Sequence, residues 1–185
     1  MCFRLGEEQS FLRWWNHKQH QKKKYTDAIV IARRHVDEAF ANKDGRLVLL
    51  ALDWAKAFDS LMPEPMFIAL KRFGLPDDFI DMVKGIYSSR SFRIQDAHGC
   101  SDVKYQYAGI CQGCPLSPVL FVIVMSVLIA DAPLALEHKV GDLAKSVSKV
   151  FYADDTLIVD QHGELAETYM QCICKQGLHY GLQLN

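Results

Sequence analysis

The chain has 185 residues, of which 50% are apolar and 23% are charged, and its formal net charge is −1. This length and composition are typical of one globular domain with a continuous core, and they exclude an intrinsically disordered protein. Because the net charge is close to zero, no overall basic field indicates nucleic-acid binding. Basic groups for such a partner would have to be local or lie on another segment.

The cysteines and the apolar runs indicate neither a disulfide scaffold nor a membrane span. The six cysteines are too scattered for a disulfide framework, so we expect reduced thiols. Arg4, Glu7 and Glu8 interrupt the N-terminal residues, so we expect no secretory signal. The longest apolar run, residues 119–130, has about a dozen residues, fewer than the roughly 18 that a membrane span requires. We expect a soluble, intracellular protein, nuclear or cytoplasmic, with no membrane partner.

The first half of the chain predicts a helix, a strand and two more helices. Residues 1–24 are poorly patterned and end in a basic patch. From Tyr25 to Phe40 the apolar residues recur at helical spacing, which predicts a packing helix. The short apolar run Leu47–Leu52 is typical of a strand buried on both faces. Pro63 and Pro76 each open a further helix, because proline is well placed in a first helical turn.

The second half predicts two hairpins, two helices and the start of a strand. A helix that is apolar nearly all round must be buried, and the helix opened by Pro115 has that pattern. The predicted elements begin with a hairpin over residues 91–95 and 103–107 and the buried helix over 115–130. A second hairpin over 150–159, a final helix over 164–180 and the start of a strand over 181–185 follow.

Carboxylates follow two of the predicted strands. Asp53 ends the first strand, and Asp154 and Asp155 occupy the turn of the second hairpin. Asp in an exposed turn often bonds only its local backbone, which is a purely structural role. If the two strands are neighbours, however, the acids converge, and clustered carboxylates repel one another unless a cation is present. Oxygen ligands of this kind suit Mg²⁺, which completes its shell with water and substrate phosphates.

Four blocks of the sequence resemble reverse transcriptases of non-LTR (LINE-like) retrotransposons, and they occur in the order of that family. They are Leu-Asp-Trp-Ala-Lys-Ala-Phe-Asp at 52–59, Gly-Ile-Cys-Gln-Gly-Cys-Pro-Leu-Ser-Pro at 109–118, Tyr-Ala-Asp-Asp at 152–155 and Gly-Leu-Gln-Leu-Asn at 181–185. The resemblance implies an α+β polymerase palm, a small antiparallel sheet backed by helices. It implies a domain over residues 25–185 with partial fingers and no thumb, truncated at its C-terminus.

The resemblance also implies an RNA-directed DNA polymerase that uses an RNA template, a DNA primer and dNTPs. Two Mg²⁺ ions, with Mn²⁺ as an alternative, would be held mainly by Asp53 and Asp154, with Asp155 as a weaker ligand and the backbone carbonyl of Trp54 facing a metal. One ion lowers the pKa of the primer 3′-hydroxyl, and the other neutralises the triphosphate and the leaving pyrophosphate.

The same resemblance assigns five residues to nucleotide binding: Trp54, Phe58, Gln112, Gly113 and Tyr152. Phe58 would lie beneath the incoming sugar and exclude a 2′-hydroxyl, although a phenylalanine here could also be an ordinary core residue. Gln112 and Gly113 would line the nucleotide and template pocket, since glutamine both donates and accepts and glycine permits close backbone approach. Tyr152 would either pack near the primer end or fill the sheet.

Cys111 and Cys114 form a Cys-x-x-Cys pattern inside the second block. Such a pattern resembles a redox motif or half of a zinc site. The candidate partners for zinc, Cys172 and Cys174, have an unusual spacing, which disfavours a zinc site.

The chain departs from the family at both ends. The Gly-Phe-Arg element expected before the first helix is replaced by Gln-Lys-Lys-Lys at 21–24, and the sequence ends before the lysine expected after Asn185. Two hypotheses remain: a palm that works only with the fingers and thumb segments of a longer polyprotein, or a catalytically inactive fragment that folds and binds RNA or a partner. Group II intron maturases share the Tyr-Ala-Asp-Asp turn, but the other blocks match LINE-like elements better.

Overall fold

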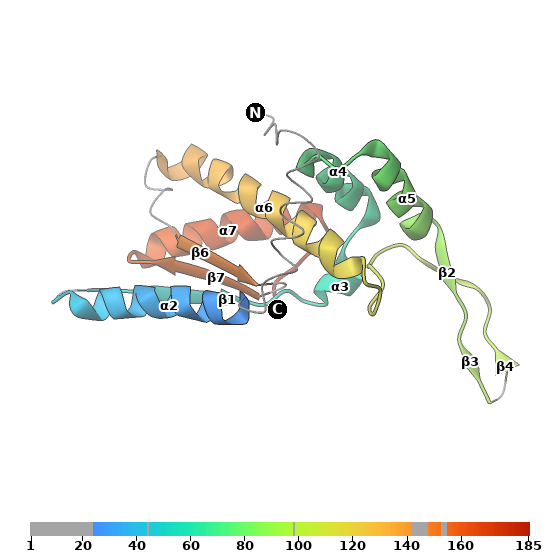
Figure 1. The fold of residues 1–185 in the computed structure, drawn as a ribbon, viewed down its shortest axis with the longest axis horizontal. Helices are drawn as coiled ribbons and strands as arrows, with labels where there is room; N and C mark the ends of the chain where they lie inside the picture. The colour runs from blue at the N-terminus through green and yellow to red at the C-terminus, as the bar shows by residue number, and fades with distance from the viewer. Residues whose placement is uncertain (1–23, 44, 98, 142–147, 153–154) are drawn as a thin grey trace. The chain divides into compact units, whose positions relative to one another are not determined.

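A computed structural model describes residues 24–43, 45–97, 99–141, 148–152 and 155–185 (Figure 1). The chain divides into two compact units, each built from segments that are distant in sequence. The first unit comprises Met1–Asp53, Asp131–Ile173 and Asn185, and the second comprises Trp54–Ala130 and Cys174–Leu184.

The first unit contains a three-stranded antiparallel sheet with the strand order β1-β7-β6. The strands are β1 (Val48–Leu52), β6 (Ser148–Tyr152) and β7 (Asp155–Asp160). The central strand β7 pairs with β1 from Val48↔Asp160 to Leu52↔Thr156 and with β6 from Ser148↔Val159 to Tyr152↔Asp155. The predicted hairpin is therefore confirmed, and the first predicted strand is its direct neighbour.

The edge strand β1 differs from its prediction. We expected a strand buried on both faces, but Leu49 is 45% exposed and Ala51 is exposed too, whereas Leu52 is buried. The reason is that β1 lies at the edge of an antiparallel sheet, and such a sheet can leave one face to water. Central β7 is the buried strand, with Ile158 fully buried.

Helices α2 (Lys24–Ala41) and α7 (Gly163–His179) flank this sheet, and α2 packs against β6. Figure 1 shows α2 and the start of α7 along opposite sides of the strands. Ile29 and Phe40 of α2 were expected to pack, yet they are 59% and 86% exposed. An 18-residue helix is about 27 Å long, whereas strands of five or six residues span roughly 17–20 Å, so the helix is longer than the sheet beneath it.

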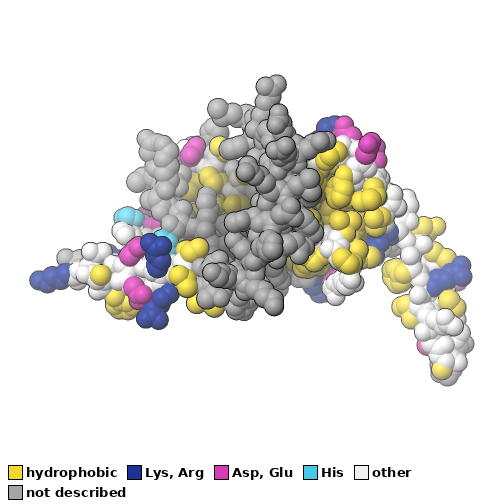
Figure 2. Space-filling model, in the orientation of Figure 1, with side chains coloured by type: hydrophobic (Ala, Val, Ile, Leu, Met, Phe, Trp, Pro, Cys, Tyr) yellow, Lys and Arg dark blue, Asp and Glu magenta, His cyan; other side chains and the backbone are white. Residues whose placement is uncertain are grey.

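The outer face of α2 carries mixed charges, as Figure 2 shows. Arg33 and Asp37 form an exposed ion pair with an Nε–Oδ1 distance of 2.9 Å, which raises the pKa of the Arg33 guanidinium through the hydrogen bond to Asp37. Exposed pairs of this kind contribute little to stability. This surface is therefore typical of a solvated helix face.

The second unit is mainly helical. Its elements are α3 (Ala57–Ser60), α4 (Pro63–Phe73), α5 (Asp77–Tyr87), the first part of α6 (Ser117–Val140), and the short strands β2 (Arg90–Phe92), β3 (Gln95–Asp96), β4 (Gly99–Cys100) and β5 (Lys104–Gln106). Helices α4 and α5 and the predicted pairing of β2 with β5 are confirmed. Helix α4 ends where Gly74, at a φ of 95°, donates its N–H to the carbonyls of Leu70 and Lys71. That is a common helix stop, since glycine adopts a positive φ at little cost.

Helix α6 is longer than predicted. It continues past Ala130 to Val140 because Ala132 and Leu136 are buried in turn. As a result, the stretch Ser117–Glu137 is long and apolar enough to cross a membrane by length and composition, which corrects the shorter run expected from the sequence. Half of that stretch is buried within the protein, as in the core helix of a globular domain.

The sheet predicts a clear contrast between two leucine-sized side chains. Ile158→Ala removes a fully buried side chain from the central strand, and we expect it to lower the free energy of unfolding by about 2–5 kcal/mol. Leu49→Ala, on the exposed face of the neighbouring strand, should cost less than about 1 kcal/mol. Urea denaturation of the two variants checks this. Equal losses would contradict the burial assigned to β7.

Candidate active site

Two acids lie at the same end of the β1–β7 ladder. The last pair of that ladder is Leu52↔Thr156; Asp53 follows Leu52 directly, and Asp155 directly precedes Thr156. Continuing the antiparallel register by one residue sets Asp53 opposite Asp155, and opposed residues project from the same face of a sheet. Both residues are exposed. The structure therefore brings together two carboxylates that are about 100 residues apart in the sequence.

Asn185 fixes one of these carboxylates. Its side-chain Nδ2 donates to Oδ2 of Asp53 at 2.5 Å, and its backbone N–H donates to the carbonyl of Asp53 at 3.0 Å. A hydrogen bond to an ionised oxygen is short and strong, so the two contacts hold both the backbone and the side chain of Asp53. Sequence reasoning gave Asn185 no role beyond ending the fourth block. Its membership of a block was the one available signal.

Trp54 belongs to the second unit and is anchored there by the end of the chain. It pairs with Leu184 in an isolated bridge, and Ala55 donates its N–H to the carbonyl of Gln183 at 2.8 Å. Its indole ring is 2% exposed and lies so close to Gly177 that a Cβ there would be 2.7 Å from Cζ3 of the ring. The side chain is thus a core residue, which leaves only the backbone of Trp54 for the metal role expected from the sequence.

Two of the sequence-predicted site residues lie wholly or partly outside the part of the chain that the structure describes. Asp154 lies outside the described residues, and for Tyr152 only the backbone is described, in β6 opposite Asp155. Among the residues that the structure does describe, no group of three or more His, Cys, Asp or Glu side chains could hold a metal ion. Asp53 and Asp155 therefore supply two of the three predicted carboxylates.

In the second unit, Phe58 lies in the short helix α3, and Gln112 is hydrogen-bonded to the same helix. The Phe58 ring stacks on Phe121 with a centroid distance of 4.8 Å, and its carbonyl accepts the N–H of Ile110 at 2.7 Å. Nε2 of Gln112 donates to both carboxylate oxygens of Asp59, at 3.0 and 3.2 Å. The loop that carries Gln112 is thus tied to helix α3. Sequence reasoning missed the role of Asp59, because this contact joins residues 53 positions apart.

Two glycines shape this loop for different reasons. Gly113 has a φ of 86°, a conformation that disfavours other L-residues, yet a Cβ there would meet nothing within 4 Å. Gly109 has a φ of 91° and also lies against the backbone of Asp59, where a Cβ would be 2.8 Å from the carbonyl oxygen. Gly109, to which sequence reasoning assigned no role, is therefore the glycine of this loop that packs closely on protein backbone.

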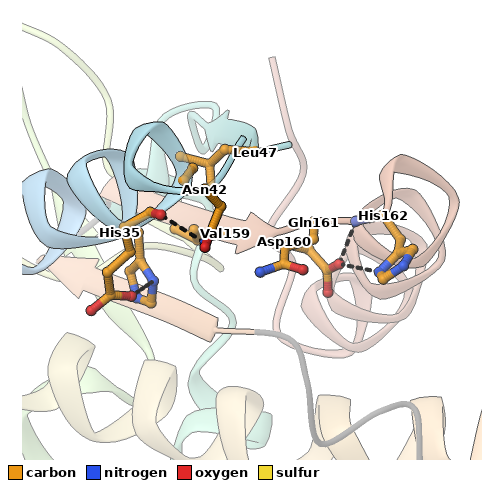
Figure 3. A pocket seen from close by; sticks show the side chains of 9 residues that line it. His35, Asn42, Leu47, Val159, Asp160, Gln161 and His162 are labelled. Atoms are coloured by element: carbon orange, nitrogen blue, oxygen red, sulfur yellow. Dashed lines mark hydrogen bonds and ion pairs between the residues drawn. The ribbon is translucent and has the colours of Figure 1, made fainter. Parts of the chain in front are cut away.

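A second polar site lies at the opposite end of β7. A cavity of about 490 Å³ is lined by residues of α2 and by the segment around Asp160, as Figure 3 shows. Asp160 is 4% exposed; its Oδ1 accepts the N–H of His162 at 2.6 Å, and Nδ1 of His162 lies 3.4 Å away. An Asp that bonds the backbone two residues on stabilises a turn. We assign Asp160 to the turn that starts α7, and sequence reasoning did not single it out.

The comparisons with known proteins agree with the family resemblance of the four sequence blocks. A family model described as reverse transcriptase (RNA-dependent DNA polymerase) matches residues 9–185. A Pol polyprotein from the type-2 retrotransposable element R2DM of Drosophila melanogaster is 32% identical over 140 residues, covering 72% of this chain and 12% of the relative. A Pol polyprotein from a type-1 retrotransposable element R2 of Popillia japonica is 26% identical over 160 residues, covering 86% of this chain and 26% of the relative.

Solved structures with a similar fold include telomerases. The chain resembles a telomerase from Candida albicans, solved in complex with a TWJ fragment of telomeric RNA, with a TM-score of 0.67 and 16% identity. The match covers 90% of this chain and 30% of that protein. A telomerase from Candida tropicalis in a similar complex gives a TM-score of 0.66 at 14% identity. At this level of identity the likeness shows the fold, which confirms an α+β polymerase arrangement.

The two kinds of glycine in the second unit predict opposite effects of adding a methyl group. Gly113→Ala meets no steric clash, so its cost comes from the positive φ alone, and we expect a loss of about 1–2 kcal/mol in the free energy of unfolding. Gly85→Ala lies in the exposed last turn of α5, where the methyl also meets nothing, and should gain up to about 0.5–1 kcal/mol. Thermal and urea denaturation measure both. A neutral Gly113→Ala would contradict the turn.

Proposed function

The chain belongs to the reverse transcriptase family, and from this premise we propose that it forms the palm of an RNA-directed DNA polymerase. The proposed reaction extends a DNA primer on an RNA template with dNTPs. The observation that supports it most is the placement of Asp53 and Asp155 on one face at the end of paired strands. The chain spans 12% and 26% of the length of two curated relatives, so the activity is proposed for the palm within the longer polyprotein.

The metal ligands of this proposal are Asp53 and Asp154, with Asp155 as a weaker ligand. The two described carboxylates are exposed and present hard oxygen donors, which suit Mg²⁺ or, in its place, Mn²⁺. Exposure also leaves room for the water and phosphate oxygens that complete the shell of Mg²⁺. When bound, two such ions supply a lowered pKa of the primer 3′-hydroxyl and neutralisation of charge on the triphosphate.

The residues around Asp53 act by positioning. Asn185 holds Oδ2 of Asp53, so the carboxylate does not have to be ordered when substrate arrives. The buried indole of Trp54 fixes the backbone that follows Asp53, and its carbonyl would be a further oxygen ligand. Fixing ligands in advance lowers the entropy cost of assembling the reacting groups.

The nucleotide residues of the proposal are Phe58, Gln112, Gly113 and Tyr152. Phe58 selects deoxynucleotides, because a ring held by stacking on Phe121 cannot move aside for a 2′-hydroxyl. Gln112 has its amide nitrogen engaged by Asp59 and therefore offers its carbonyl oxygen as an acceptor. The positive φ of Gly113 sets the direction of this loop. Tyr152, on β6, pairs with Asp155 of β7.

Primer extension tests the proposal. The substrate is poly(rA) with an oligo(dT) primer, labelled dTTP and Mg²⁺, and the protein is assayed both as this chain and within the longer polyprotein. We expect Asp53→Asn to lower incorporation by on the order of 10³-fold, because the main carboxylate ligand is lost. The matched control is Asp102→Asn, an exposed acid in the loop before β5, which should retain the wild-type rate.

Two outcomes contradict the proposal. Asp53→Asn could incorporate nucleotide as fast as the wild type, which would remove Asp53 from the reaction. Alternatively, the wild-type chain could give no incorporation above that of Asp53→Asn even when supplied within the whole polyprotein. That second result supports the inactive-fragment hypothesis.

A further inference from the structure

The loop between Gly109 and helix α6 contains a turn with a cysteine at each end. The N–H of Cys114 donates to the carbonyl of Cys111 at 3.3 Å, and Gly113 has a φ of 86°. A hydrogen bond from the fourth residue to the first, with a positive φ at the third, is the pattern of a type II turn. Such turns bring their outer Cα atoms within about 7 Å, and disulfides span about 4.4–6.8 Å between Cα atoms. The Cα atoms of the two cysteines therefore lie in the range that a disulfide spans.

Both sulfur atoms lie beside groups that donate hydrogen bonds. Nη2 of Arg90 donates to Sγ of Cys111 at 3.0 Å, while Nη1 of the same guanidinium donates to the carbonyl of Gly109 at 3.4 Å. The backbone N–H of Leu116 lowers the pKa of the Cys114 thiol. Cationic groups and backbone donors at the start of a helix are the surroundings in which cysteines become reactive. Both cysteines are partly exposed, so a small oxidant can reach them.

The other described cysteines lack these features. Cys172 and Cys174 lie two residues apart on α7, and residues at that spacing do not face each other on a helix. Burial raises the pKa of the Cys174 thiol, which makes it less reactive. Cys100 is exposed on β4. Within the described part of the chain, the turn 111–114 is thus the place where two thiols, a cation and a backbone donor come together.

We propose that Cys111 and Cys114 form a reversible disulfide with a hydroperoxide as the oxidant. The Cys114 thiolate attacks one peroxide oxygen, the O–O bond breaks, and the departing hydroxide takes a proton to become water. The Cys111 sulfur then attacks the sulfenic acid at Cys114, the S–S bond forms, and the S–O bond breaks with loss of a second water. In sum, two thiols lose two hydrogen atoms and hydrogen peroxide becomes two waters. A thiol reductant reverses the bridge by exchange.

The bridge has a consequence for the loop that rests on the proposed function. Bridging takes Sγ of Cys111 away from Arg90 and constrains Gln112 and Gly113, which lie between the two cysteines. The bridge therefore alters or strains the hydrogen bond from Gln112 to Asp59. If these residues bind the nucleotide, oxidation alters nucleotide binding. The bridge itself does not depend on that activity.

Peptide mass spectrometry tests the bridge on the full chain. The protein is reduced, treated with hydrogen peroxide, alkylated and digested with trypsin, which releases residues 105–139 as one peptide with Cys111 and Cys114 as its two cysteines. We expect neither cysteine of this peptide to be alkylated. The peptide should be lighter by two hydrogen atoms than its reduced, unalkylated form. Dithiothreitol should restore alkylation at both cysteines.

The variants make the result specific. Cys111→Ser and Cys114→Ser should each abolish the lighter peptide, while Cys174→Ser should leave it unchanged. Arg90→Gln keeps a hydrogen-bond donor but removes the charge, and we expect it to slow bridge formation severalfold. A peptide that stays reduced and alkylated, or that links equally to Cys100 or to a second chain, overturns the proposal. Because the readout is a mass, a failure of the polymerase assay leaves this result unaffected.

Discussion

The antiparallel register between β1 and β7 is the constraint on which the candidate site depends. Leu50 lies opposite Ile158 at the centre of the ladder, and the fully buried Ile158 specifies that pairing through the core. A slip of one residue would send Asp155 to the other face of the sheet and would separate it from Asp53. The apolar residues of two short strands therefore determine where the carboxylates meet.

Contacts that are remote in sequence then complete what the sheet begins. Asn185 holds Asp53 across 132 positions, and Asp59 holds Gln112 across 53. In each pair both members lie in one of the four blocks, and one of them orients the other. Asn185, which follows Leu184, therefore does more than begin a strand. Its backbone and its side chain both contact Asp53, the residue that the proposed chemistry needs most.

The sequence was sufficient for features that depend on short-range patterns. Helical spacing predicted α2, proline positions predicted α4 and α5, and turn residues predicted both hairpins, because each pattern reflects its local backbone. It was insufficient where the answer depends on distant neighbours. Helix α3 is only one turn long and follows Lys56, which has a φ of 47°, and no periodicity signals such a helix. The exposure of Leu49 depends on β1 being an edge strand, and the contacts of Asp59 and Asn185 depend on the complete fold.

The most direct test of the account is where a divalent ion binds along the β1–β7 ladder. Mn²⁺, added to ¹⁵N-labelled protein, broadens amide signals near the site, and the ladder ends lie about 13 Å apart at a rise of roughly 3.3 Å per residue. At substoichiometric Mn²⁺, the account predicts that the amides of Ala51 and Thr156 broaden more than those of Val48 and His162, and that Asp53→Asn removes this difference. Broadening centred on His162, beside the cavity in Figure 3, would contradict it.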